Sequence, residues 1–384
     1  MEGKATIISD DDDGNEVDGD LTIQGSDDGN PQLEIFVEDD AINCDGEVDI
    51  LNCKIRISAG YWGVFADTIN VDNSELVIFS DEDGLYSDGE LLIEDSVIVI
   101  LSYYDSAINS DDNMTFTASE LNISSLDSVG IYSGDGKISF VDCDVRVEST
   151  DDIAISAPDN DISVSGGRLV IVSKEEALKG NKITLSDNVF MDLSTLNANY
   201  NLFEMYDTSD FSLPGIICLY DIDGNKLYEG EWSSEFLDGT ELYVDGQEVF
   251  RVVSVCIHEW DTDVWEKDEN YHWHPCKNPY CDENNHENCD GYGEHNPQLI
   301  NALAATETID GYTGDTVCKD CGYLISSGTV ISATGTNPGP GNPNSPNAGD
   351  YRNLGLWIGL LLVGGCTACG VVIYRKRNNK IMSE

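Results

Sequence analysis

The chain has 384 residues, and its 73 acidic and 19 basic side chains give a formal net charge of −54 at pH 7. Such an acidic chain cannot neutralise phosphates, which excludes nucleic acid as a partner. Strong acidity can also signal disorder, but 40% of the residues are hydrophobic and follow a regular spacing, which predicts a folded core.

A short pattern returns about eight times between residues 31 and 194. Each unit opens with a small residue followed by an aliphatic one, and successive units begin 21 to 24 residues apart. A unit of this length cannot bury a core alone, whereas stacked units bury a continuous one, so the repeat predicts a solenoid. The small residues that open the units are Ala41, Gly63, Gly84, Ala107, Gly130, Ala154 and Ala177.

Turns separate short runs of alternating apolar residues within each unit, such as Leu91/Ile93 and Ile98/Ile100. The alternation turns one face of each run inward, and Ile and Val favour strands. We therefore expect an all-β fold, a right-handed parallel β-helix of about eight coils over residues 1–195, with about three strands per coil. An antiparallel β-sandwich is the alternative, but it does not explain the regular return of one aliphatic residue.

The amino end shows no secretory leader, because Met1-Glu2-Gly3-Lys4 runs straight into a polar, acidic stretch. Leu21 and Ile23 already fit a coil strand. We expect further coils upstream of this start; a truly cytoplasmic protein, the alternative, would conflict with the carboxyl end.

Six aspartates follow the repeated tetrapeptide at nearly the same offset. Equivalent positions in neighbouring coils lie about 4.8 Å apart, where two like charges repel by roughly 1 kcal/mol in water and by more near a protein surface. Ca²⁺ tolerates irregular oxygen cages and would relieve this repulsion. The alternative is a solvated acidic face. The expected calcium ligands are Asp45, Asp67, Asp88, Asp111, Asp135 and Asp159.

Aromatic residues gather near the same edge of the predicted coils. Flat rings stack on sugar rings, and bound cations could bridge uronic acids to aspartate, so this edge suits a polysaccharide. The alternative is that the rings only cover the turns. The expected carbohydrate contacts are Tyr61, Trp62, Phe65, Tyr86, Tyr104 and Tyr132.

Residues 196–255 contain Asp-Gly pairs at 223–224 and 245–246 between apolar runs, which predict hairpins. We expect a small β cap here, because the open end of a solenoid would otherwise pair with other chains.

Residues 256–332 hold all five His and six of the twelve Cys residues. The Cys318-x-x-Cys321 pair and the earlier Cys276 and Cys281 have metal-ligand character. These four cysteines are expected to close a tetrahedral, structural zinc site, with His286 as a substitute ligand. Disulfides are the alternative, because the compartment is expected to be extracellular.

The carboxyl end predicts the location. A Pro/Gly-rich linker covers residues 333–350, residues 354–374 form an uncharged apolar span long enough for a transmembrane helix, and residues 375–384 form a basic tail that the positive-inside rule places in the cytoplasm. This order resembles the sorting signal of Gram-positive surface proteins, a Leu-Pro-any-Thr-Gly pentapeptide before a span and a basic tail. Ser345 replaces Leu and Ala348 replaces Thr. The resemblance implies cleavage between Ala348 and Gly349 and attachment to peptidoglycan; a plain membrane anchor is the alternative.

Two further resemblances concern function. The coil motif is similar to a family of clostridial surface proteins, and the His-Trp-His-x-Cys and Cys-x-x-Cys-Gly motifs resemble a stalk module in surface proteins of anaerobic Firmicutes. They imply a cell-surface protein that binds polysaccharide and calcium without acting as an enzyme, and we expect a monomer. An adhesin that binds protein is one alternative. A pectate-lyase-like enzyme is the other, although Arg56 and Arg146 lie four coils apart and no His precedes His258.

Overall fold

The computed structural model describes residues 4–9, 16–17, 19–25, 32–186, 189–256, 258–278, 281 and 286–335. The fold of these residues is all-β, and the helices among them are two short 3-10 turns, η1 (Ser234–Phe236) and η2 (His286–Asn288). Contacts divide the chain into two compact units, residues 1–294 and residues 295–384.

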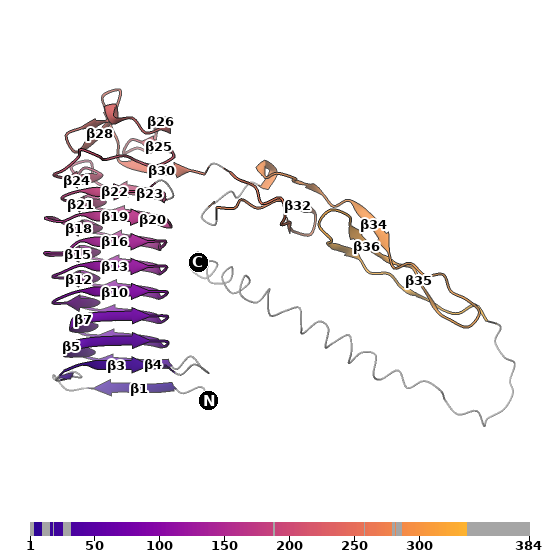
Figure 1. Cartoon of the computed structure of the whole chain (residues 1–384), viewed down its shortest axis with the longest axis horizontal. Coiled ribbons are helices and arrows are strands. Elements are labelled where there is room, and N and C mark those ends of the chain that lie inside the picture. The colour runs from indigo at the N-terminus through magenta and orange to yellow at the C-terminus, as the bar shows by residue number, and fades with distance from the viewer. Residues whose placement is uncertain are drawn as a thin grey trace. The chain divides into compact units, whose positions relative to one another are not determined.

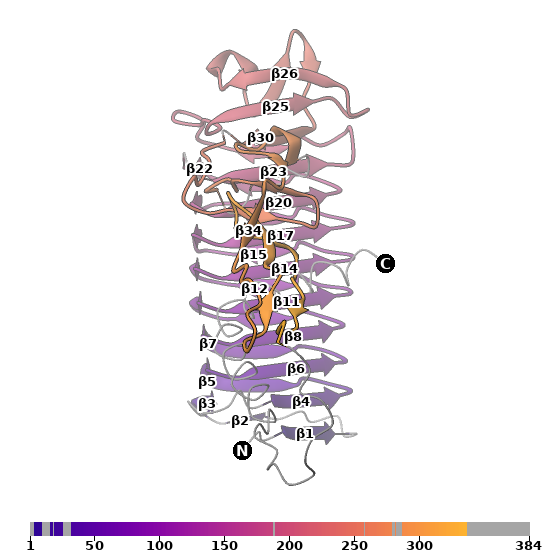
Figure 2. The ribbon, with the colours of Figure 1, turned by 90° about the vertical axis from the view of Figure 1, so that its right-hand side faces the viewer.

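The first unit contains a parallel β-solenoid of about eight turns, in which equivalent strands of successive coils lie one above another (Figures 1 and 2). One face of it is a 12-stranded sheet. In spatial order its strands are β1 (Lys4–Ser9), β4 (Gln32–Val37), β6 (Lys54–Ala59), β8 (Glu75–Ser80), β11 (Val97–Ser102), β14 (Glu120–Ser125), β17 (Asp144–Ser149), β20 (Arg168–Ser173), β23 (Phe190–Thr195), β30 (Arg251–Val255), β25 (Ile216–Tyr220) and β26 (Lys226–Glu231).

A 15-stranded sheet forms the rest of the wall. Its strands are β2 (Glu16–Val17), β3 (Leu21–Gln24), β5 (Ile42–Leu51), β7 (Val64–Asp72), β9 (Leu85–Ser87), β10 (Leu91–Glu94), β12 (Ile108–Ser110), β13 (Met114–Thr117), β15 (Ile131–Ser133), β16 (Ile138–Val141), β18 (Ile155–Ala157), β19 (Ile162–Ser165), β21 (Leu178–Gly180), β22 (Ile183–Leu185) and β24 (Phe203–Met205). The long strand β7 pairs with β9 through its first half and with β10 through its second half. One sheet therefore covers two faces, and later coils such as β9–β10–β11 have three strands each, as predicted.

Strand pairing decides between the two architectures that the sequence left open. The strands from β4 to β23 pair in parallel with their equivalents in the next coil. The parallel solenoid is confirmed, and the antiparallel sandwich is wrong. Leu21 and Ile23 pair with Val48 and Ile50, so they belong to a coil strand, as expected. The right-handed winding stays a prediction.

The repeated tetrapeptide forms the centre of the core. Its aliphatic residues are register partners in successive coils, and each is at most 2% exposed. The opening residue must be small because neighbouring coils lie close together: a Cβ on Gly84 would lie 2.6 Å from the carbonyl oxygen of Ala107. Phe203 adds a rung that the repeat did not show. The ladder runs through Ile42, Val64, Leu85, Ile108, Ile131, Ile155, Leu178 and Phe203.

A tight turn precedes each of the strands β6, β8, β11, β14 and β17 of the 12-stranded sheet. One residue in each turn has a positive φ of 45° to 54°, a conformation that Asn and Asp tolerate better than other non-glycine residues. Stacking adds hydrogen bonds between coils, because the Asn73 amide donates to Asn52 Oδ1 over 2.7 Å. The positive-φ residues are Asn52, Asn73, Asp95, Ala118 and Asp142.

Antiparallel strands end the solenoid. β30 pairs with β23, and β25 and β26 extend the sheet beyond it. A small antiparallel sheet follows β26 in the chain, made of β27 (Leu237–Asp238), β28 (Glu241–Val244) and β29 (Gln247–Glu248). Through β30, these segments cover the edge of β23, which the last coil would otherwise expose.

Short strands make up the Cys/His-rich stretch. In the first unit they are β31 (Glu266–Lys267), β32 (Tyr271–Trp273) and β33 (Gly293–Glu294). In the second unit they are β34 (Pro297–Ile300), β35 (Gly311–Tyr312), β36 (Asp315–Cys318), β37 (Leu324–Ser326) and β38 (Val330–Ile331).

No helix among the described residues is both long and apolar enough to cross a bilayer. The predicted linker after residue 335, the apolar span at 354–374 and the basic tail at 375–384 lie outside the described residues.

Candidate functional site

Backbone pairing after the end of β30 assembles a group of Cys and His side chains. Cys256 follows β30 directly. The Lys277 amide donates to the Glu259 carbonyl over 2.7 Å, and the Asp261 amide donates to the Pro275 carbonyl over 2.8 Å. This short antiparallel contact places Cys256 and its near neighbour in the chain, His258, opposite the segment that carries Cys276.

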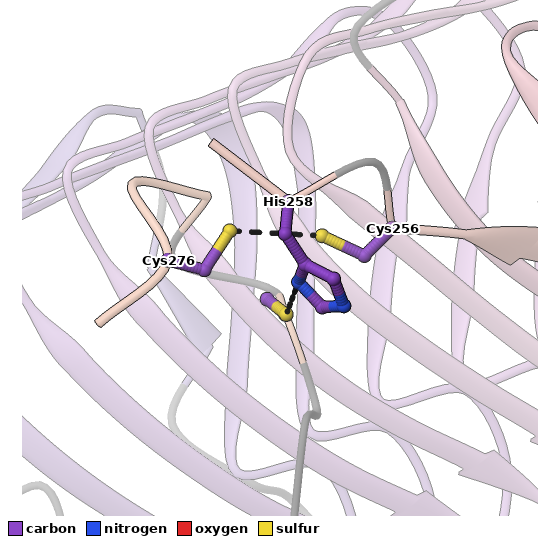
Figure 3. A group of neighbouring side chains, drawn as sticks. Cys256, His258 and Cys276 are labelled. Atoms are coloured by element: carbon purple, nitrogen blue, oxygen red, sulfur yellow. Dashed lines mark hydrogen bonds between the residues drawn. The ribbon is translucent and has the colours of Figure 1, made fainter. Parts of the chain in front are cut away.

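Four ligand atoms converge there, from Cys256, His258, Cys276 and Cys281, all within 4.8 Å of one another. The sulfur atoms of Cys256 and Cys276 are 3.7 Å apart beside the His258 ring (Figure 3). The Cys281 sulfur lies 3.3 Å from His258 Nδ1. The His258 ring stacks on Trp260, with ring centroids 4.6 Å apart. This group could hold a metal ion such as zinc.

The thiols in this group have unequal acidities. Burial opposes the ionisation of Cys276, but hydrogen bonds from His258 and from backbone amides outweigh it and lower the pKa of Cys276 to about 7. Burial and hydrogen bonds with Cys281 and Cys276 raise the pKa of Cys256 to about 12. One thiolate therefore forms readily, and a second forms only with a cation beside it.

A second group lies in residues 295–335. His295, Cys318 and Cys321 bring their ligand atoms within 4.8 Å of one another, and the Cys321 sulfur is 3.5 Å from His295 Nδ1. β36 ends at Cys318, and the turn after it is closed by the Gly322 amide, which donates to the Cys318 carbonyl. Gly322 has a φ of 70°, which glycine adopts without strain. This group, too, could hold a metal ion such as zinc.

The four cysteines predicted as one zinc site are divided between these two groups. Cys276 and Cys281 belong to the first, and Cys318 and Cys321 belong to the second. The substitute ligand, His286, stacks on Trp273 instead, with ring centroids 3.9 Å apart. No two described cysteines form a disulfide.

Sequence reasoning missed Cys256, His258 and His295 as ligands. The Cys-x-His spacing at 256–258 was a signal. Two side chains separated by one residue point to the same side of an extended chain and can therefore bind the same ion.

The six predicted calcium ligands are all exposed; Asp45 and Asp67 lie within strands β5 and β7, and the other four lie in turns or bends that follow the tetrapeptide. The groups of converging ligand atoms found among the described residues do not include Asp45, Asp67, Asp88, Asp111, Asp135 or Asp159. Calcium at this edge stays a prediction.

Three of the acids that precede the tetrapeptide, Asp40, Asp83 and Glu176, are buried. Asp83 is 3% exposed and accepts a hydrogen bond from the Asn109 amide over 3.3 Å, while its Oδ1 has no partner. Burial, together with the negative charges of Asp105 and Glu82, raises the pKa of Asp83 to about 8. Burial likewise raises the pKa of Asp40. These carboxyls are candidates for neutral groups inside an acidic protein.

Three of the six predicted sugar contacts form a stack of nearly parallel rings, and Tyr61 packs at a tilt against Trp62, with ring centroids 4.8 Å apart. The rings of Trp62, Phe65 and Tyr86 are half-buried and nearly parallel, with centroids 4.8 to 5.8 Å apart. Their faces cover each other, which favours the interpretation that these rings stabilise the coils. Tyr132 lies two coils beyond Tyr86. Tyr61 and Tyr104, at 40% and 64% exposure, have the accessible rings.

A depression of about 350 Å³ lies on the outer side of the 12-stranded face. Phe36, Phe79 and Tyr103 contribute rings, and Arg56 and Asp81 contribute charges. Phe36 and Tyr103 are 38% and 43% exposed. A sugar ring could stack on these surfaces, and the two charged groups could bind its polar substituents.

Arg56 is the basic group of this depression. Its guanidinium lies over the Phe79 ring, 5.5 Å from the centroid. Among the described residues no carboxylate forms an ion pair with Arg56. Arg56 is exposed, so its guanidinium is accessible to a ligand in the depression. The sequence did not predict Phe36 and Phe79 as part of this surface. They point outward from β4 and β8, which lie on either side of β6 in the sheet.

The predicted sorting residues Ala348 and Gly349 lie outside the described residues. No protein-family model, curated protein or solved structure matches this chain.

Proposed function

We propose that the solenoid is a non-enzymatic, cell-surface binding module for a polysaccharide that carries uronic acids. The observation that carries this proposal is the depression that Phe36, Phe79 and Tyr103 line together with Arg56, whose guanidinium lies over the Phe79 ring. Aromatic faces bind the apolar side of a sugar ring. A guanidinium binds a carboxylate through two parallel hydrogen bonds.

The charge of the chain limits this binding. A net charge of −54 repels a polyanion at long range, so one arginine is not sufficient for tight binding. The proposal therefore includes calcium at the acidic turns, where it would lower the repulsion and bridge uronate to aspartate. The cell-surface location rests on the apolar span at 354–374 and the basic tail.

Arg56→Gln is expected to weaken retention of the full chain on immobilised polygalacturonate by about ten- to a hundredfold, the effect of losing one charge-assisted contact of about 1.5–3 kcal/mol. Arg146→Gln is the matched control, because Arg146 is an exposed outward residue of the same coil position four coils away. Affinity electrophoresis with and without calcium measures both. Equal weakening by the two substitutions would show that only net charge matters and would overturn the role of Arg56.

Tyr103→Ala is expected to weaken binding to polygalacturonate and to a neutral glucan such as cellulose alike, by about tenfold, because stacking does not depend on charge. Tyr206→Ala is the control: Tyr206 is 70% exposed and lies outside the depression. Pull-down on insoluble polysaccharide measures both variants. Undiminished binding by Tyr103→Ala would remove the depression from the proposal.

We also propose that the Cys/His-rich stretch is an extracellular stalk whose groups hold zinc. The support is that both groups offer sulfur and nitrogen ligands and no carboxylate.

A further inference from the structure

We infer that Cys256, His258, Cys276 and Cys281 form one closed, tetrahedral zinc site that stabilises the fold of the stretch after β30. This inference rests on the zinc proposal and is independent of the polysaccharide proposal. Two of the four ligands, Cys256 and His258, are absent from the set that the sequence predicted.

The distances fit the edges of a zinc tetrahedron. Zn–S bonds of about 2.3 Å and Zn–N bonds of about 2.0 Å at tetrahedral angles place two sulfurs about 3.8 Å apart and a sulfur and a nitrogen about 3.5 Å apart. The observed sulfur–sulfur distance between Cys256 and Cys276 is 3.7 Å, and Cys281 Sγ lies 3.3 Å from His258 Nδ1. Two of the six edges therefore have about the length that the ion requires, and the other ligand atoms lie within 4.8 Å of one another.

The ligand types select the metal. Three sulfurs and one imidazole nitrogen suit zinc, whereas Ca²⁺ and Mg²⁺ require oxygen ligands. Four protein ligands leave no position for water, so the ion would be structural and not catalytic. A bound cation would compensate the negative charge of the three thiolates that hold it.

The stretch also needs such a ligand for its stability. Among the described residues of 256–294, the buried hydrophobic side chains are Trp273 and Cys289 alone. The remaining interior is built from aromatic contacts between Trp265 and the His272 and His274 rings, with centroids 4.7 and 3.8 Å away. A core this small cannot offset the conformational entropy of the chain, and small modules of this kind are commonly held together by a metal or by disulfides.

The test uses the full chain, purified under reducing conditions without added chelator. Inductively coupled plasma mass spectrometry measures the number of zinc ions per chain. Cys256→Ser is expected to lose one zinc per chain. Cys318→Ser is expected to keep that ion, because Cys318 belongs to the other group, so the double variant Cys256→Ser/Cys318→Ser should contain one zinc fewer than Cys318→Ser alone. Cys289→Ser is the matched control, since Cys289 lies in the same stretch but outside both groups, and it should lose no zinc.

Cobalt substitution gives a second readout that survives a change in stability. The Co²⁺-loaded chain should show thiolate charge-transfer bands, and His258→Cys should retain the metal and shift its visible band to longer wavelength as nitrogen is replaced by sulfur. The inference is overturned if Cys256→Ser loses no zinc, if Cys318→Ser removes the same ion, or if thiol labelling finds Cys256 and Cys276 joined in a disulfide. The polysaccharide proposal would stand after any of these results.

Discussion

Asp83→Asn is expected to raise the free energy of unfolding at pH 7 by about 2–4 kcal/mol. The folded protein holds Asp83 in a buried position where its pKa is about 8, compared with a usual value of 3.8. Each pKa unit between folded and unfolded states corresponds to about 1.4 kcal/mol. Asparagine has the same shape and no charge to desolvate, and its amide can donate to Asn109 Oδ1, which has no partner in the structure.

The dependence on pH identifies the cause. Below about pH 4 both the folded and the unfolded chain carry a proton on Asp83, so the residue costs nothing. Between about pH 4 and pH 8 the folded protein keeps a proton that the unfolded chain releases, so stability falls as pH rises. Above about pH 8 both states are ionised and the cost is constant. The advantage of the variant should therefore be near zero at pH 4 and greatest above pH 8.

Urea unfolding followed by circular dichroism at pH 4, 6 and 8 measures this difference. Glu94→Gln is the control, because Glu94 lies near Asp83 in the chain but is exposed and belongs to none of the predicted sites. Parallel stability curves for the Asp83→Asn variant and the parent chain would show that Asp83 is not held in its neutral form.

The solenoid was predictable from the sequence because one spacing serves every coil. An aliphatic residue that returns every 21 to 24 positions can only meet its equivalents if the coils stack in parallel, and the ladder from Ile42 to Phe203 is what the structure shows. The repeat did not predict Phe203. Leu202 stands before it, where the other units have Ala or Gly.

The grouping of the metal ligands was harder to predict. A Cys-x-x-Cys pair shows that two ligands act together, but it does not show which distant pair completes the site. Here the backbone contacts of Glu259 with Lys277 and of Asp261 with Pro275 decide it. These contacts lie between irregular segments without a repeated spacing, so nothing in the sequence predicts their register.

The depression was missed for a related reason. The predicted sugar contacts belong to one edge of the coils, and three of them, Trp62, Phe65 and Tyr86, form a half-buried stack. Phe36 and Phe79 lie on strands of different coils, two coils apart. Only the register of the sheet brings them to one surface with Arg56.

Phe116→Ala is expected to lower the free energy of unfolding by about 3–5 kcal/mol, the usual cost of removing a fully buried Phe side chain. Phe116 and Phe140 are register partners in β13 and β16, both at most 1% exposed, and their rings stack with centroids 4.8 Å apart. Loss of one ring leaves a cavity between coils that the stacked backbone cannot close. Phe116→Leu, which keeps most of the volume, should cost less, and Thr115→Ala, an outward change on the same strand, should be almost neutral.

The form of the unfolding curve should change as well. The stability of a solenoid is close to a sum of the stabilities of its coils and of the interfaces between them, so one weakened interface reduces the coupling between the two sides. In the parent chain, the backbone amides of the coils on both sides of β13 should lose protection against hydrogen exchange together. In Phe116→Ala, we expect the two groups of coils to lose protection separately. A destabilisation below about 1 kcal/mol, or a loss of protection confined to residues 114–117, would mean that the coils repack around the cavity and that the core is less continuous than its ladders indicate.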